Sequence, residues 1–129
     1  MGTPGEVVYP ELESNAEVYR AYPFPDSFDN RSGKPKPKLF YRKTNETGLS
    51  LGLSPAGTLL RYPGAVGMCR LIVRDIVDCP DPLHLVRDAV DHAEIRGVPT
   101  RDEDQERALR IAKYLARIAE DWRDTRLPS

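Results

Sequence analysis

The sequence predicts one α+β domain, in which a small and largely antiparallel sheet is covered by a C-terminal amphipathic helix. Three observations lead to this class. The chain has 129 residues, which suits a single domain with its own core. Short runs with strand periodicity lie before residue 100, and one long helical pattern follows them. Strands that precede a helix, instead of alternating with helices, are typical of α+β domains. We therefore expect residues 1–129 to form one unit.

The first expected strand lies at residues 17–22, after a polar lead at residues 1–15 that is either a flexible tail or an added edge strand. Prolines directly after this strand end it, since proline cannot donate to a sheet ladder. Residues 26–38 are expected to form a loop that finishes in an extended Lys-Pro alternation. The run at 39–43 then predicts a short strand.

An alternating pattern over residues 49–54 predicts a strand with one apolar face and one small, polar face. The apolar residues are Leu49, Leu51 and Leu53, and the small ones are Ser50, Gly52 and Ser54. Ser54-Pro55 is typical of a helix start, with serine as the N-cap and proline in the first turn. We therefore expect Ser50 on a face that a ligand could approach closely.

Residues 66–73 form the best candidate for a buried strand, and residues 74–78 are expected to make a helical turn. Residues 83–99 leave two alternatives open. Apolar residues at helical spacing favour a helix, whereas two short strands would cover 84–87 and 92–96. The residue pattern by itself does not choose between them.

The C-terminal helix is expected at residues 101–122. Thr100 and Glu103 have the spacing of a capping box, in which each side chain bonds the backbone amide of the other residue. One stripe of the helix is apolar and consists of Ala108, Ala112, Leu115, Ala119 and Trp122. Its small alanines suit close packing on a sheet.

The composition narrows the classes of function. Nineteen basic and 20 acidic side chains leave a formal charge of -1, and this balance argues against a nucleic-acid partner. The weakest hypothesis is therefore a nucleic-acid interface formed by Lys34, Lys36, Lys38 and Arg42. No signal-peptide pattern and no long apolar run are present, so a cytoplasmic protein without a membrane span is expected.

Neither a metal nor a cofactor is expected from the motifs. The two cysteines and two histidines, Cys69, Cys79, His84 and His92, lack the paired spacing of a structural zinc site. No Gly-rich phosphate loop is present. The residues 48–52 also lack the spacing of a hydrolase nucleophile elbow.

A looser set of polar residues forms the candidate site. Two Tyr-Arg pairs, Tyr19-Arg20 and Tyr41-Arg42, are candidates for ligand binding, because a guanidinium suits phosphate and a phenol can stack on a ring. Ser50 could donate a hydrogen bond to the same ligand. The candidate catalytic residues are His92, which follows an aspartate, and Glu94.

The sequence resembles a family of small uncharacterised bacterial proteins. The matching motifs are Tyr19-Arg20, Phe40, Gly48-Leu49-Ser50, the apolar run 66–73 and the segment 92–99, which follows a His-Ala-x-Ile-x-Gly-x-Pro pattern. The resemblance covers most of residues 18–120 and favours strands in the open segment. It implies no particular activity.

A second resemblance is to NAD-handling folds of the ADP-ribosyltransferase type, through the Tyr-Arg of an early strand and a serine on a later one. It implies that Arg20 holds the dinucleotide phosphates and that Ser50 shapes the nicotinamide pocket. The family's late catalytic glutamate would be Glu94, and NAD would be the cofactor.

Two functions are expected. The first is a protein-interaction or regulatory module, since no strong catalytic motif is present. The alternative is an NAD- or nucleotide-handling enzyme of a toxin-like kind, in which Arg20, Ser50 and His92 or Glu94 converge on one cleft.

Overall fold

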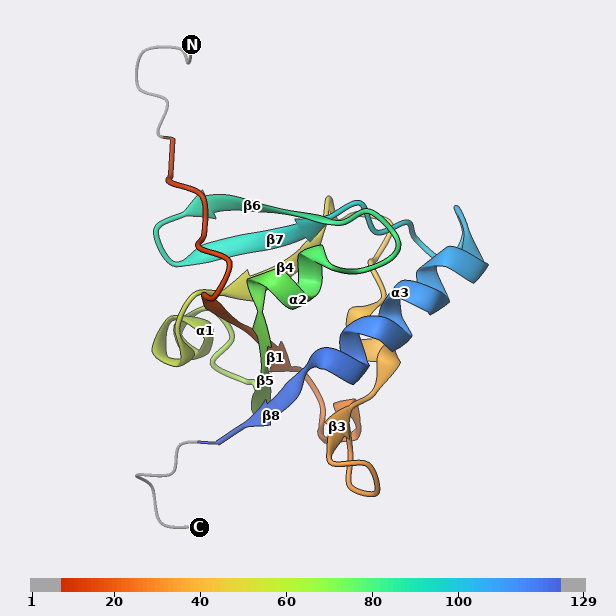
Figure 1. Ribbon diagram of the computed structural model, residues 1–129. Helices are drawn as coiled ribbons and strands as arrows, with labels where there is room; N and C mark the ends of the chain where they lie inside the picture. Colours follow the sequence, from red (N-terminus) through yellow and green to blue (C-terminus); the bar gives the residue numbers. More distant parts are fainter. Residues whose placement is uncertain (1–7, 124–129) are drawn as a thin grey trace.

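The computed structural model describes residues 8–123, and six strands of this part form one antiparallel sheet (Figure 1). Their order across the sheet is β6-β7-β4-β1-β5-β8, and every neighbouring pair runs antiparallel. The strands are β1 Glu17–Tyr22, β4 Leu49–Gly52, β5 Gly67–Ile72, β6 His84–Ala89, β7 His92–Arg96 and β8 Glu120–Trp122. The small α+β domain with an antiparallel sheet is confirmed.

Helices and a small ribbon complete the described part of the chain. The α-helices are α1 Pro55–Arg61, α2 Val73–Val77 and α3 Gln105–Ile118, and the 3-10 helices are η1 Pro25–Ser27 and η2 Pro37–Phe40. The ribbon pairs β2 Phe28–Asp29 with β3 Lys34–Pro35. Among residues 8–123, no helix is long and apolar enough to cross a membrane.

One face of the sheet carries the core. Leu49 and Leu51 of β4 are fully buried there, as the alternating pattern predicts. Ile111 and Leu115 of α3 belong to the same buried cluster. Figure 1 shows α3 and α2 lying along this side of the sheet. The amphipathic helix therefore covers the sheet as expected.

The side chains on the opposite face of β4 are small, and α1 packs closely against this face. A Cβ at Gly52 would be 1.9 Å from Oγ1 of Thr58, so no larger residue fits without a shift. Ser54 caps α1 by accepting a hydrogen bond of 2.9 Å from the amide of Gly57, which confirms the expected helix start.

The sheet opens between β1 and β4. β1 pairs with β5 along its whole length, from Glu17 to Tyr22, but it meets β4 at one position, where Tyr19 lies opposite Gly52. At the next residue of β1, the guanidinium of Arg20 reaches across to β4 in place of backbone pairing. Its Nε and Nη1 each donate a 2.8 Å hydrogen bond, to the carbonyl oxygens of Leu39 and Ser50. Arg20 thus satisfies a carbonyl that sheet pairing leaves free.

The prediction of a helix at residues 101–122 is wrong at both ends, because α3 begins later, at Gln105, and ends earlier, at Ile118. The capping box forms, since Thr100 and Glu103 exchange hydrogen bonds of 2.8 and 3.2 Å, but it closes a turn before the helix. Asp104 is the N-cap of α3 and accepts a 3.0 Å bond from the amide of Arg107. At the other end, residues 120–122 are β8, where Trp122 pairs opposite Met68 of β5. There, pairing with β5 as the edge strand of the sheet overrides helical propensity.

Two further expectations are settled. The open segment forms the strands β6 and β7, and not a helix. The expected strand at 39–43 is wrong, because Pro37 starts the 3-10 helix η2 and only Arg42 makes a bridge, to Thr100. Of the polar lead, residues 1–7 lie outside the described residues, and residues 8–15 form no strand.

Candidate functional site

A pocket of about 540 Å³ lies where β1 and β4 separate. Its lining comes from β1, the segment around η2, Ser50 of β4, and the end of α1 with the loop that follows: Arg20, Ala21, Pro23, Lys38, Leu39, Tyr41, Lys43, Glu46, Ser50, Arg61, Tyr62, Pro63, Gly64 and Ala65. This volume is within the range of small-molecule sites, about 300–1,000 Å³. Arg20, Tyr41 and Ser50 are thereby brought together from distant parts of the sequence.

The charged side chains that line the pocket are mainly cationic. Four basic side chains face one carboxylate, that of Glu46. Lys38 forms an ion pair of 2.5 Å with Asp26, and Arg61 one of 3.1 Å with Asp91. Lys43 has no carboxylate within ion-pair distance among residues 8–123. An anion would therefore meet a net positive field in the pocket.

Arg20 serves both the sheet and the pocket. Burial lowers the pKa of its guanidinium, but arginine remains protonated in proteins. Two carbonyls engage Nε and Nη1, whereas Nη2 has no protein acceptor in the described part of the chain. The side chain lines the pocket, so this third donor is available to a ligand.

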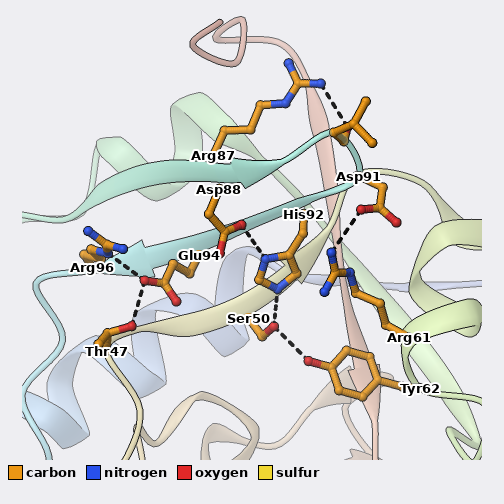
Figure 2. Close-up of polar contacts among 11 residues, drawn as sticks. Thr47, Ser50, Arg61, Tyr62, Arg87, Asp88, Asp91, His92, Glu94 and Arg96 are labelled. Carbon is orange, nitrogen blue, oxygen red and sulfur yellow. Dashed lines mark hydrogen bonds and ion pairs between the residues drawn. The ribbon is translucent and has the colours of Figure 1, made fainter. Parts of the chain in front are cut away.

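Four side chains form a continuous hydrogen-bonded chain beside the pocket (Figure 2). Oδ1 of Asp88 lies 2.6 Å from Nδ1 of His92, and Nε2 of His92 contacts Oγ of Ser50. The hydroxyl of Tyr62 donates to the same Oγ at 2.8 Å. The chain runs from an outer carboxylate, through the side chain of His92, which is 10% exposed, to a hydroxyl that lines the pocket.

The strand register explains why these side chains meet. Ser50 pairs opposite Glu94 and Gly52 opposite His92, so Ser50 and His92 are diagonal neighbours on one face. Asp88 is an extra residue on β6, between Arg87, which pairs with Ala93, and Ala89, which pairs with His92. A bulge of this kind redirects side chains, and here Asp88 reaches the imidazole.

The hydrogen bonds that link Asp88, His92, Ser50 and Tyr62 allow one consistent assignment of donors and acceptors. An ionised carboxylate can only accept, so Nδ1 of His92 carries its proton toward Asp88. Nε2 is then free to accept the hydroxyl proton of Ser50, whose oxygen accepts from Tyr62. The arrangement can polarise the Ser50 hydroxyl at the wall of the pocket.

Glu94 lies next to Ser50 but is engaged elsewhere. Its Oε1 accepts a 2.9 Å hydrogen bond from Thr47 and a 2.6 Å bond from Nε of Arg96. Its side chain is 12% exposed and lines none of the pockets described in the structure. The Glu94 carboxylate thus lies on the same face of the sheet as Ser50, where it is held by the guanidinium of Arg96.

Two other candidates lie away from the pocket. The ring of Tyr19 packs edge-on against Trp122, and burial together with Glu17 raises the pKa of its phenol to about 12. Arg42 donates to the carbonyls of Val98 and Glu46 and pairs with Glu103 at 2.6 Å. Both residues hold parts of the fold together. Tyr41 does line the pocket, with the guanidinium carbon of Arg101 4.9 Å from its ring centre.

Sequence reasoning missed Asp88 and Tyr62, which complete the chain around Ser50. Asp91, the sequence neighbour of His92, pairs with Arg61 instead. One signal existed for Asp88, since in the two-strand alternative it begins the turn that leads to His92. Tyr62 carried no signal, because its place depends on how α1 lies on the sheet.

Within residues 8–123, no group of three or more His, Cys, Asp or Glu side chains could hold a metal ion. Comparisons of this chain with protein-family models, with curated proteins and with solved structures found no match.

Proposed function

We propose that the protein binds a nucleotide-sized anion, with NAD as the first candidate, and acts as an NAD- or nucleotide-handling enzyme of ADP-ribosyltransferase type. The observation that carries the proposal is that Arg20 and Ser50 line one cationic pocket, although they are far apart in the sequence. Its volume of about 540 Å³ suits a ligand of this size.

Each part of the ligand has a partner in the pocket. Nη2 of Arg20 and the ammonium of Lys43 suit phosphate oxygens. The rings of Tyr41 and Tyr62 offer faces for a base or a nicotinamide ring. Ser50 lines the same pocket with a hydroxyl that His92 and Tyr62 polarise.

Thermal-shift measurements test the proposal. A ligand that binds only the folded state stabilises it by about 2.7 kcal/mol at a hundredfold excess over its Kd. NAD and ADP-ribose should raise the melting temperature, and nicotinamide or sulfate alone should raise it less. If no nucleotide raises it at millimolar concentration, the proposal is wrong.

A matched pair of lysine variants tests the site. Lys43→Ala removes a pocket cation, and Lys113→Ala removes the same charge from the exposed side of α3. The Lys43 variant should weaken nucleotide binding by about 3- to 10-fold, since a phosphate contact is worth about 1 kcal/mol. The Lys113 variant should bind as the wild type does.

The second candidate is a protein-interaction or regulatory module in the cytoplasm. The observation in its favour is that Leu60 is 81% exposed and Val66 is 57% exposed, each next in the sequence to a residue that lines the pocket. Leu60→Ser should then abolish capture of a cellular partner and leave nucleotide binding unchanged. A partner captured equally by this variant would argue against this role for Leu60.

The lysines of residues 34–38 do not favour a nucleic-acid partner, and Lys34 lies in β3 and Lys38 in η2, not in the extended loop that the sequence predicts. Lys34 donates to the carbonyl of Ala119 at 2.9 Å, and Lys38 pairs with Asp26. Arg42 is committed to the fold, as described above. Because Lys34, Lys38 and Arg42 make contacts within the protein, they are less available to bind the phosphates of a nucleic acid.

A further inference from the structure

The Ser50 hydroxyl has a proton acceptor on one side and a donor on the other. Nε2 of His92 contacts its oxygen, and Tyr62 donates to the same oxygen at 2.8 Å. Pocket binding alone needs only the hydroxyl, and it leaves the buried imidazole and its carboxylate without a role. An ordered carboxylate, imidazole and hydroxyl is the arrangement that activates a serine.

We propose that Ser50 is a nucleophile activated by His92 and Asp88, and that it takes an acyl group from an ester of a nucleotide-sized anionic alcohol. The choice of an anionic alcohol rests on the proposed function of the pocket. The reactivity of Ser50 does not, because it follows from the hydrogen-bonded chain.

The reaction balances with water as the only other reactant. Oγ of Ser50 forms a bond to the acyl carbon while its proton passes to Nε2 of His92. The bond from the acyl carbon to the leaving oxygen then breaks, and His92 returns the proton to that oxygen. Water attacks the acyl-serine by the same route, which releases a carboxylic acid and restores Ser50.

The surroundings of the chain suit this role. The side chain of His92 is 10% exposed, so bulk water has little access to it, whereas Ser50 is open to the pocket. Asp88 is a positioning residue, because its carboxylate holds the proton on Nδ1 and leaves Nε2 as the acceptor. Tyr62 donates a hydrogen bond to the reacting oxygen and so helps to hold the Ser50 hydroxyl in place.

A serine-directed fluorophosphonate tests the inference on the wild-type protein. The reagent loses fluoride when a serine oxygen attacks phosphorus, and peptide mass mapping identifies the labelled residue. Ser50 should be labelled at least about tenfold faster in the folded protein than in urea, because the general base exists only in the fold. A smaller ratio, or no adduct on Ser50, overturns the inference.

Matched histidine variants test the base. His92→Gln should lower the labelling rate of Ser50 by at least about 100-fold, the usual minimum for loss of a general base. His84→Gln changes the exposed histidine of β6 and should label at the wild-type rate. An unchanged rate in the His92 variant overturns the inference, as does an equal loss in both variants. Circular dichroism identifies any variant that fails to fold, and the wild-type measurement then decides alone.

Asp88 needs a readout that separates positioning from stability. Asp88→Asn should slow the labelling of Ser50 without a matching fall in melting temperature, because the amide favours the wrong tautomer of His92. Asp88→Glu should recover part of the rate. Labelling that follows melting temperature alone across these variants contradicts the positioning role.

The two proposals fail separately. Fast labelling of Ser50 in a protein that no nucleotide stabilises keeps the nucleophile and removes the anionic alcohol as its substrate. Nucleotide binding without labelling keeps the pocket and removes the nucleophile.

Discussion

Replacement of Gly52 by alanine tests whether α1 lies directly on the sheet. The added Cβ would be 1.9 Å from Oγ1 of Thr58, and rotation of that side chain would still leave Thr58 Cβ at 2.9 Å and Cα at 3.1 Å. The first turns of α1 must therefore move, and Thr58 must also give up its 2.7 Å hydrogen bond to the carbonyl of Ser54. Overpacking costs about 1 kcal/mol or more, and loss of a buried hydrogen bond costs about 1–2 kcal/mol.

The expected loss of about 2–3 kcal/mol corresponds to a fall in melting temperature of about 6–15 °C for a domain of this size. Scanning calorimetry measures it, with Gly64→Ala as the control, since no atom lies within 4 Å of a Cβ placed there. Thr58→Ala in the Gly52→Ala background should recover at least about 1 kcal/mol relative to additive effects. A Gly52→Ala protein that melts within about 2 °C of the wild type would refute the described contact between α1 and β4.

Three further predictions concern single side chains. Arg20→Met keeps the apolar stem but strips two carbonyls of their donors, so urea unfolding should show a loss of about 2–4 kcal/mol, and a loss below about 0.5 kcal/mol would contradict this account. Arg110 holds the pKa of the Asp81 carboxyl below its ordinary value of 3.8, so the stabilisation is present above that value and is lost as the pH falls through the lower folded pKa. Asp81→Asn should therefore be less stable than the wild type at pH 6, the difference should vanish once the pH lies below the folded pKa of Asp81, and a difference that persists in strong acid would exclude this pair as its source. Burial raises the pKa of the Cys69 thiol to about 12, so a thiol reagent at pH 8 should modify this residue only after unfolding, and rapid modification of the folded protein would contradict its burial.

Local sequence patterns predicted much of the fold because their causes are local. Alternation over residues 49–54 indicated which side of β4 is buried, and Ser54 and Pro55 indicated where α1 begins. The same reasoning misjudged the end of α3, since residues 120–122 have helical spacing but pair with β5. That choice depends on a strand about 50 residues earlier in the chain.

The sequence by itself determined that Ser50 lies on the face away from the core and that Arg20 lies on a strand. Strand alternation is a property of neighbouring residues, so it needs no tertiary information. Only the tertiary structure decided that both residues border one pocket, because β1 and β4 meet at a single position and then separate. It also decided that Asp88 and Tyr62 complete the hydrogen-bonded chain through His92 to Ser50. The bulge in β6 places Asp88, and the packing of α1 against Gly52 places Tyr62. Register and packing are set by contacts between distant segments, and no local pattern records them.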